Sequence, residues 1–98
     1  MTDIAELMQK RMALVERTAA LNSRQLRNTQ IRSGIEVELL ACIEAIERDG
    51  ETRESLARRD DLEARYKAAA AACANCDREL DKLADELGAL DQQAGPAP

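Results

Sequence analysis

The chain has 98 residues, of which 45% are apolar and 34% are charged, and its formal net charge is −5 at pH 7. Ala, Leu, Glu, Arg and Lys make up 55 of the 98 residues, a composition typical of long helices and coiled coils. So short a chain holds one domain at most and would bury little surface as a compact globule. The length and composition of the chain therefore favour long paired helices over a globular fold.

The residue types needed for common catalytic and metal sites are scarce. The sequence has no histidine for acid–base chemistry, no glycine-rich phosphate loop, and no Ser or Cys beside a recognisable base. It also has no secretory signal and no apolar run of about 18 residues that would suit a membrane span. We therefore expect a cytoplasmic, non-enzymatic protein with no cofactor, no metal site and no membrane association.

The first helix is expected to begin at Asp3, because Asp3 and Glu6 have the spacing of a capping box. Apolar residues follow at helical spacing: Ile4, Leu7, Met8, Met12, Leu14, Val15 and Leu21. They cover more than one side of the helix, which is wider than a single partner helix can bury. Methionine side chains adapt to irregular surfaces, so this face is a candidate contact for a second copy or for a foreign partner.

Residues 22–34 interrupt the apolar pattern. The stretch is polar, and Ser33 with Gly34 could start a new helix, so a kink or break competes with one continuous helix. We favour continuity, because apolar spacing resumes at Ile31 and Ile35 and continues to Ile46. Gly50 then predicts a left-handed helix stop.

Two helices of similar length flank this glycine, which predicts a long antiparallel hairpin resembling a coiled coil. We expect a first helix over 3–49, a turn at 49–52 and, with Thr52 as N-cap, a second helix over 52–91. Together they form a single helical hairpin domain over 1–93, followed by a disordered tail over 94–98. The hairpin is expected to form homo-oligomers.

The second helix carries the strongest pattern in the sequence, a heptad seam with alternating steps of four and three residues. Its members are Leu62, Tyr66, Ala69, Cys73, Cys76, Leu80, Leu83, Leu87 and Leu90. The pattern leaves open whether this seam pairs within one chain or between chains. Cys73 and Cys76 have the spacing of redox and zinc half-sites, but they occupy core positions beside Asp77 and Glu79, which disfavour thiolates. With Cys42 they form an odd set of three, so we interpret all three as reduced core residues.

Charge is divided unequally along the chain. Residues 1–33 carry six basic and three acidic side chains, whereas acidic residues dominate the remainder. In an antiparallel hairpin this asymmetry attracts the two arms to each other. Arg24, Arg27 and Arg32 could instead contact an acidic partner or the phosphates of a nucleic acid. The absence of stacking aromatics argues against nucleic acid, as does the pI of about 4.8.

These observations predict a protein–protein interaction module, a small helical adaptor, chaperone or inhibitor that acts through helix packing. The expected contact residues, for a second copy or a partner, are Leu7, Met8, Met12, Val15, Leu80, Leu83, Leu87 and Leu90. Two alternatives remain. One is a nucleic-acid-associated helical protein that uses the three arginines. The other is an inhibitor that mimics nucleic acid with Asp77, Glu79, Asp81, Asp85 and Glu86.

Overall fold

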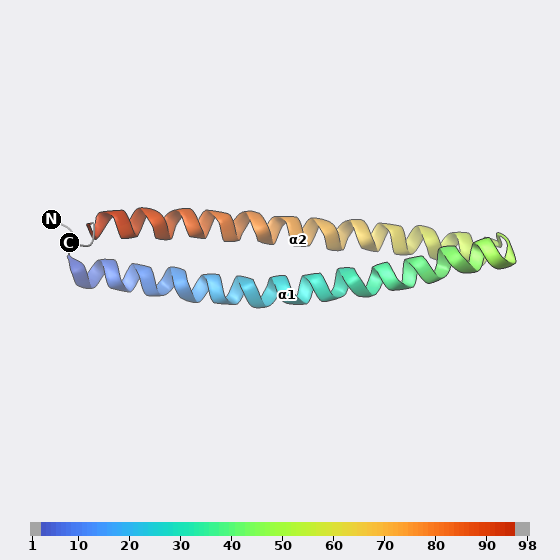
Figure 1. Cartoon of the computed structure of the whole chain (residues 1–98), viewed down its shortest axis with the longest axis horizontal. Coiled ribbons are helices and arrows are strands. Elements are labelled where there is room, and N and C mark those ends of the chain that lie inside the picture. The colour runs from blue at the N-terminus through green and yellow to red at the C-terminus, as the bar shows by residue number, and fades with distance from the viewer. Residues whose placement is uncertain (1–2, 96–98) are drawn as a thin grey trace. The chain divides into compact units, whose positions relative to one another are not determined.

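A computed structural model describes residues 3–95 and shows an all-α hairpin of two antiparallel helices, α1 (Ile4–Asp49) and α2 (Arg53–Gln93) (Figure 1). The predicted fold class is confirmed. Helix α1 continues through residues 22–34 without interruption, so the polar stretch is helical and Ser33 does not cap a new helix. No helix within residues 3–95 is both long and apolar enough to cross a membrane.

The helix ends follow the local signals in the sequence. Gly50 has a φ of 89°, and its N–H donates to the carbonyl of Ile46 at 2.8 Å, which ends α1 as predicted. Thr52 Oγ1 accepts the N–H of Ser55 at 3.0 Å, and Ser55 Oγ accepts the N–H of Thr52 at 2.9 Å. This reciprocal pair caps α2. Asp3 caps α1 by accepting the N–H two residues further on at 3.1 Å.

The far end of α2 is also closed by a left-handed glycine. Gly95 has a φ of 90°, and its N–H donates to the carbonyl of Gln92 at 3.1 Å. The predicted tail over 94–98 lies outside the described residues from position 96 onward.

The chain divides into two compact units, each made of a segment of α1 lying antiparallel to a segment of α2. The turn unit is Leu26–Ala74 and contains the connection between the helices. The terminal unit contains the chain up to Gln25 and from Asn75 onward.

The core of the turn unit combines both helices. Ile35 and Cys42 of α1 are buried with Leu62 and Ala69 of α2, and the half-buried Leu39, Ile46 and Tyr66 pack against them. The Tyr66 hydroxyl donates to Glu36 Oε1 at 3.1 Å, which gives the phenol a polar partner at the rim of the core.

The terminal unit has a core cluster of its own, and Leu7 and Leu90 are also buried in this unit. Leu21 of α1 is buried with Cys76 and Leu83 of α2, and the half-buried Leu14 and Leu80 pack against this group. Cys76 Sγ donates to the carbonyl of Leu21 at 3.4 Å, so the cysteine also makes a polar contact between the helices.

The inward face of α1 has a heptad repeat of its own. Its apolar members are Leu7, Leu14, Leu21, Ile35 and Cys42, which are spaced by seven residues except where Asn28 takes the position between Leu21 and Ile35. All five are buried or half-buried. In the terminal unit the alternate positions of this inward seam are polar: Arg11, Thr18 and Gln25. These polar residues interrupt the apolar pattern, so the seam of α1 is harder to recognise in the sequence than the seam of α2. They also bury little apolar surface.

Candidate protein-interaction surface

A row of apolar side chains lies on α1 in the terminal unit, outside the hairpin core. Its members, which we call the outer stripe, are Met8, Met12, Val15 and Ala19. Met8 and Met12 are each 61% exposed and Val15 is 44% exposed, and Ala19 is exposed as well. Single exposed apolar residues are common on soluble proteins, but a contiguous row of them marks a surface that another molecule can cover.

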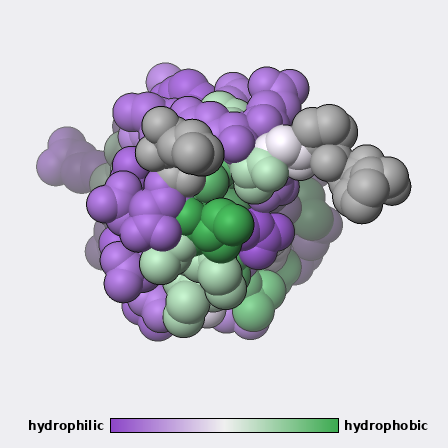
Figure 2. Space-filling view, turned by 90° about the vertical axis from the view of Figure 1, so that its left-hand side faces the viewer, coloured by the Kyte–Doolittle hydropathy of each residue, from purple (hydrophilic) through white to green (hydrophobic). Residues whose placement is uncertain are grey.

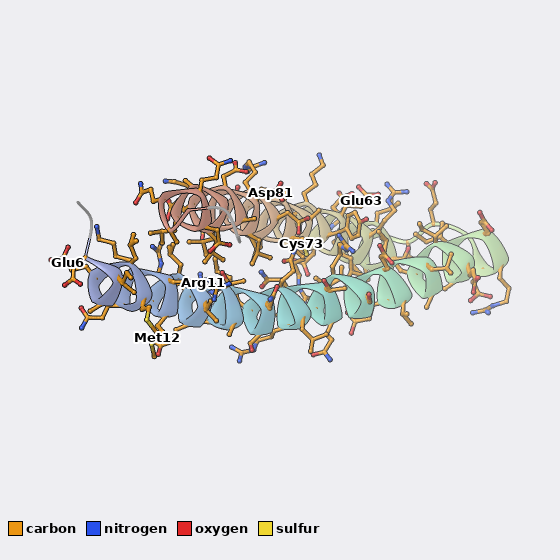
Figure 3. All side chains as sticks on the ribbon, turned by 60° about the vertical axis from the view of Figure 1, so that its left-hand side comes forward. Glu6, Arg11, Met12, Glu63, Cys73 and Asp81 are labelled. Carbon is orange, nitrogen blue, oxygen red and sulfur yellow. The ribbon has the colours of Figure 1, made fainter. Side chains whose placement is uncertain are left out.

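The outer stripe is distinct from the inward seam of α1. Successive residues in an α-helix are rotated by about 100°, so the stripe is displaced from the inward seam by roughly a quarter of the helix circumference. Figure 3 shows the consequence, because Met12 projects away from α2 whereas the adjacent Arg11 lies toward it. Helix α1 therefore has two apolar faces, and α2 covers only one of them.

The outer stripe borders a shallow groove with charged edges. The groove has a volume of about 270 Å³ and is lined by Met8, Arg11, Met12, Val15 and Glu16. Arg11 Nε donates to Asp91 Oδ1 of α2 at 3.1 Å, and the two side chains are 56% and 57% exposed. This ion pair holds the guanidinium beside the stripe while leaving much of it accessible.

A second apolar area lies at the end of the terminal unit and is continuous with the stripe through Met8. Figure 2, which looks onto this end, shows it as a green region among hydrophilic side chains. The groove there is lined by Ile4, Leu7, Met8, Arg11, Leu90, Asp91 and Ala94. Ile4 is 72% exposed, so this end also presents uncovered apolar surface.

The expected contact residues separate into two sets. Met8, Met12 and Val15 are exposed, as a docking face requires. By contrast, Leu83 is only 2% exposed, Leu7 and Leu90 are buried, and Leu80 and Leu87 are half-buried. The structure thus answers the question of pairing: the leucines of the α2 seam face α1 of the same chain. Little of their surface is left for another molecule.

The three arginines lie in different environments. Arg24 lines a groove with Arg17, Leu21 and Glu79, so an acidic side chain of α2 already lies near it. Arg27 is exposed, and Arg32 is half-buried. Among the acidic candidates, Asp77 Oδ1 accepts a hydrogen bond from Gln25 Nε2 at 2.6 Å. Arg24 thus lies near an acidic side chain of α2, and Asp77 is bound by a neutral amide of α1.

The cysteines occupy the cores. Cys73 and Cys76 are each 4% exposed, Cys42 is 7% exposed, and none of the three forms a disulfide. Cys42 Sγ donates to the carbonyl of Ser55 at 3.6 Å. Within residues 3–95, no group of three or more His, Cys, Asp or Glu side chains is arranged to hold a metal ion.

Sequence reasoning identified Met8, Met12 and Val15 as contact residues, but it placed Leu7 on the same face and did not include Ala19. The signal was present, because Leu7, Leu14 and Leu21 recur every seven residues, the same interval as in the seam of α2. In the sequence, the inward seam and the outer stripe of α1 overlap, and together they resemble a single broad apolar face. Comparisons with known proteins add no relative, since no family model, curated protein or solved structure matches the chain.

Proposed function

We propose that this protein is a non-enzymatic interaction module that binds a helix of another polypeptide along the outer stripe of α1. The observation that carries the proposal is the exposure of Met8, Met12 and Val15 on a helix whose other apolar face is already covered. Apolar anchors spaced at helical intervals suit recognition of an amphipathic helix. An adaptor, chaperone or inhibitor of the helical class would act in this way.

The charges around the stripe support recognition of a helix over non-specific adhesion. Arg11 and Glu16 line the same groove as the methionines, so an apolar centre is bordered by polar groups of both signs. This resembles the arrangement of protein interfaces, in which a desolvated apolar core is surrounded by a polar rim. Methionine tolerates partner side chains of different shape, as a binding module requires.

A matched pair of substitutions tests the proposal. Met12→Glu places a charge in the outer stripe, and Leu40→Glu places the same charge at a similarly exposed apolar site, since the two residues are 61% and 57% exposed. We expect both variants to retain wild-type helicity by circular dichroism. Only Met12→Glu should lose association, measured as molar mass by light scattering and as capture of protein from a lysate of the native host. Unchanged mass and unchanged capture in Met12→Glu would contradict the proposed function.

Nucleic-acid binding through Arg24, Arg27 and Arg32 remains the alternative. Replacing all three arginines with alanine should leave association unchanged if the outer stripe is the functional surface. Binding to DNA or RNA at low salt that disappears in this triple variant would favour the alternative instead.

A further inference from the structure

We propose that the helix bound along the outer stripe is α1 of a second copy of this chain, lying parallel and in register. The inference rests on the proposed function and names the occupant of the same surface. It places two α1 helices side by side in the terminal units of the two copies, so that each α1 contacts its own α2 with one face and the second α1 with the other.

The spacing of the outer stripe is that of a coiled-coil seam. From Met8 to Met12, to Val15 and to Ala19 the steps are four, three and four residues, the same alternation as in the seam of α2. A helix that packs along such a seam needs a matching repeat at the same intervals. Helix α1 of a second copy has this repeat by identity.

The charges beside the stripe are complementary to each other. Arg11 and Glu16 border opposite sides of the stripe and are separated by five residues. In a parallel pair of helices, a flanking residue on one helix meets the residue five positions later on the opposite flank of its neighbour. Arg11 of each copy therefore meets Glu16 of the other, and the twofold symmetry makes the ion pair twice.

An antiparallel arrangement lacks this match. Flanking residues then meet residues from the same flank of the neighbouring helix, so Arg11 would face Thr18 or Arg11 of the second copy. No oppositely charged side chain lies on that flank within the span of the stripe. The charge pattern thus selects the parallel orientation.

The side chain of Arg11 is already positioned for the second contact. Its Nε donates to Asp91 Oδ1 at 3.1 Å, and the residue is 56% exposed. A guanidinium has five N–H donors in a planar fork, so a carboxylate of another molecule can bind while the bond to Asp91 is kept. Because Asp91 already restrains the Arg11 side chain, Arg11 loses less conformational entropy when the two copies associate.

The polar end of the stripe sets the register. The next position after Ala19 in the stripe is Asn22, which is exposed. In register, Asn22 of one copy lies opposite Asn22 of the other, where each amide can both donate and accept. A shifted register would place this amide against an alanine or a valine, and a single polar residue at such a position is known to specify register.

Two single-cysteine substitutions test orientation and register. Met8→Cys and Ala19→Cys each place a thiol in the stripe, whereas the native cysteines are 4% to 7% exposed and should not cross-link in the wild type. Parallel, in-register helices predict that each variant alone forms a disulfide-linked dimer on mild oxidation. An antiparallel pair centred on the stripe separates the two Met8→Cys thiols by about 16 Å along the helix axis. In that arrangement a disulfide would form only when the Met8→Cys and Ala19→Cys variants are mixed.

A charge exchange provides an independent measurement. Arg11→Glu and Glu16→Arg each replace two attractions by two repulsions, so each should raise the dimer dissociation constant by about tenfold. A mixture of the two variants restores both attractions and should form heterodimers in preference to either homodimer. Because Arg11→Glu also removes the ion pair with Asp91 of the same chain, Asp91→Asn serves as the control for that loss. A mixture that binds no more tightly than the separate variants would overturn the proposal.

The outcomes also separate this inference from the proposed function. A wild-type protein that is monomeric by light scattering, or that cross-links only as the mixture, overturns the parallel dimer. The interaction module would still stand in the first case if Met12→Glu lost capture of another protein while Leu40→Glu kept it. If Met12→Glu altered neither mass nor capture, both proposals would fail together.

Discussion

The turn unit and the terminal unit are built from the same two helices, but they use α1 differently. In the turn unit, every position of the inward seam from Ile35 to Ile46 is apolar, and these residues are buried or half-buried in the hairpin. In the terminal unit, Arg11, Thr18 and Gln25 take alternate seam positions, while Met8 and Met12 lie outside the core. The terminal unit thus has polar residues in the inward seam of α1, and its exposed apolar residues Met8, Met12 and Val15 lie at coiled-coil spacing.

The exposed apolar residues of the two units also differ in arrangement. Leu26, Ile31, Val37 and Leu40 are exposed in the turn unit, and Val37 lines a groove with Ala41 and Ala45. The steps of five, six and three residues between the four exposed side chains do not form a heptad seam. In the terminal unit the outer stripe is continuous over four positions. Apolar residues outside the hairpin core are available to another molecule, and we expect contacts to form where such residues are contiguous.

The largest expected effect comes from charges placed in the two cores. Leu62 in the turn unit is 1% exposed and Leu83 in the terminal unit is 2% exposed, so an aspartate at either site buries an unpaired carboxylate. We expect each substitution to cost at least about 3 kcal/mol of unfolding free energy.

The two variants should differ in how far unfolding spreads. The turn unit pairs segments joined by a short connection, whereas the terminal unit pairs segments separated by the whole of Leu26–Ala74. Loop closure therefore favours the turn unit. Hydrogen exchange should show that Leu83→Asp unprotects the terminal unit alone and that Leu62→Asp unprotects both. Equal loss of protection in both variants would show that the units unfold as one.

A moderate effect is expected at the cap of α2. Thr52→Ala removes the side-chain oxygen that accepts the N–H of Ser55 at 3.0 Å. Loss of such a cap should lower the unfolding free energy by about 1 kcal/mol, whereas Thr52→Ser keeps the acceptor and should change it little. Urea titration at one fixed protein concentration measures both variants. A similar loss in the serine variant would rule out capping as the cause.

A gain in unfolding free energy of similar size is expected when glycines inside the helices are replaced with alanine. Gly34 in α1 and Gly88 in α2 are exposed, and a Cβ added at either site meets no heavy atom within 4 Å. Replacement with alanine should therefore raise the unfolding free energy by about 0.5 to 1 kcal/mol at each site. Gly50→Ala is the contrasting control, because the φ of 89° at this turn is strained for any residue with a Cβ. Thermal unfolding followed by circular dichroism should show a higher Tm for the alanine variants at Gly34 and Gly88 and a lower Tm for Gly50→Ala.

The smallest effect is expected at the ion pair between the helices. Asp91→Ala removes the partner of Arg11, but the two side chains are 56% and 57% exposed. Solvent screens such a pair, so the variant should lose less than about 1 kcal/mol, and the loss should shrink further in high salt. A loss that is larger and independent of salt would show that Asp91 contributes by packing.

Much of the fold could be predicted because its signals are local or strongly periodic. The stop at Gly50 and the caps at Asp3 and Thr52 depend on a few neighbouring residues. The seam of α2 is visible because its apolar and cysteine positions alternate regularly over the length of the helix. The outer stripe was also visible, since methionines and a valine at helical spacing mark an apolar face whatever covers it.

Only the tertiary structure decided which face of α1 pairs with α2. The heptad of Leu7, Leu14 and Leu21 competes in the sequence with the stripe of Met8, Met12 and Val15, and both are apolar at helical spacing. Both rows repeat every seven residues, but only the leucine row continues in phase along α1 to Ile35 and Cys42, which are buried against α2. Periodicity within one helix thus determined that apolar faces exist, whereas matching between two helices determined which of them is buried.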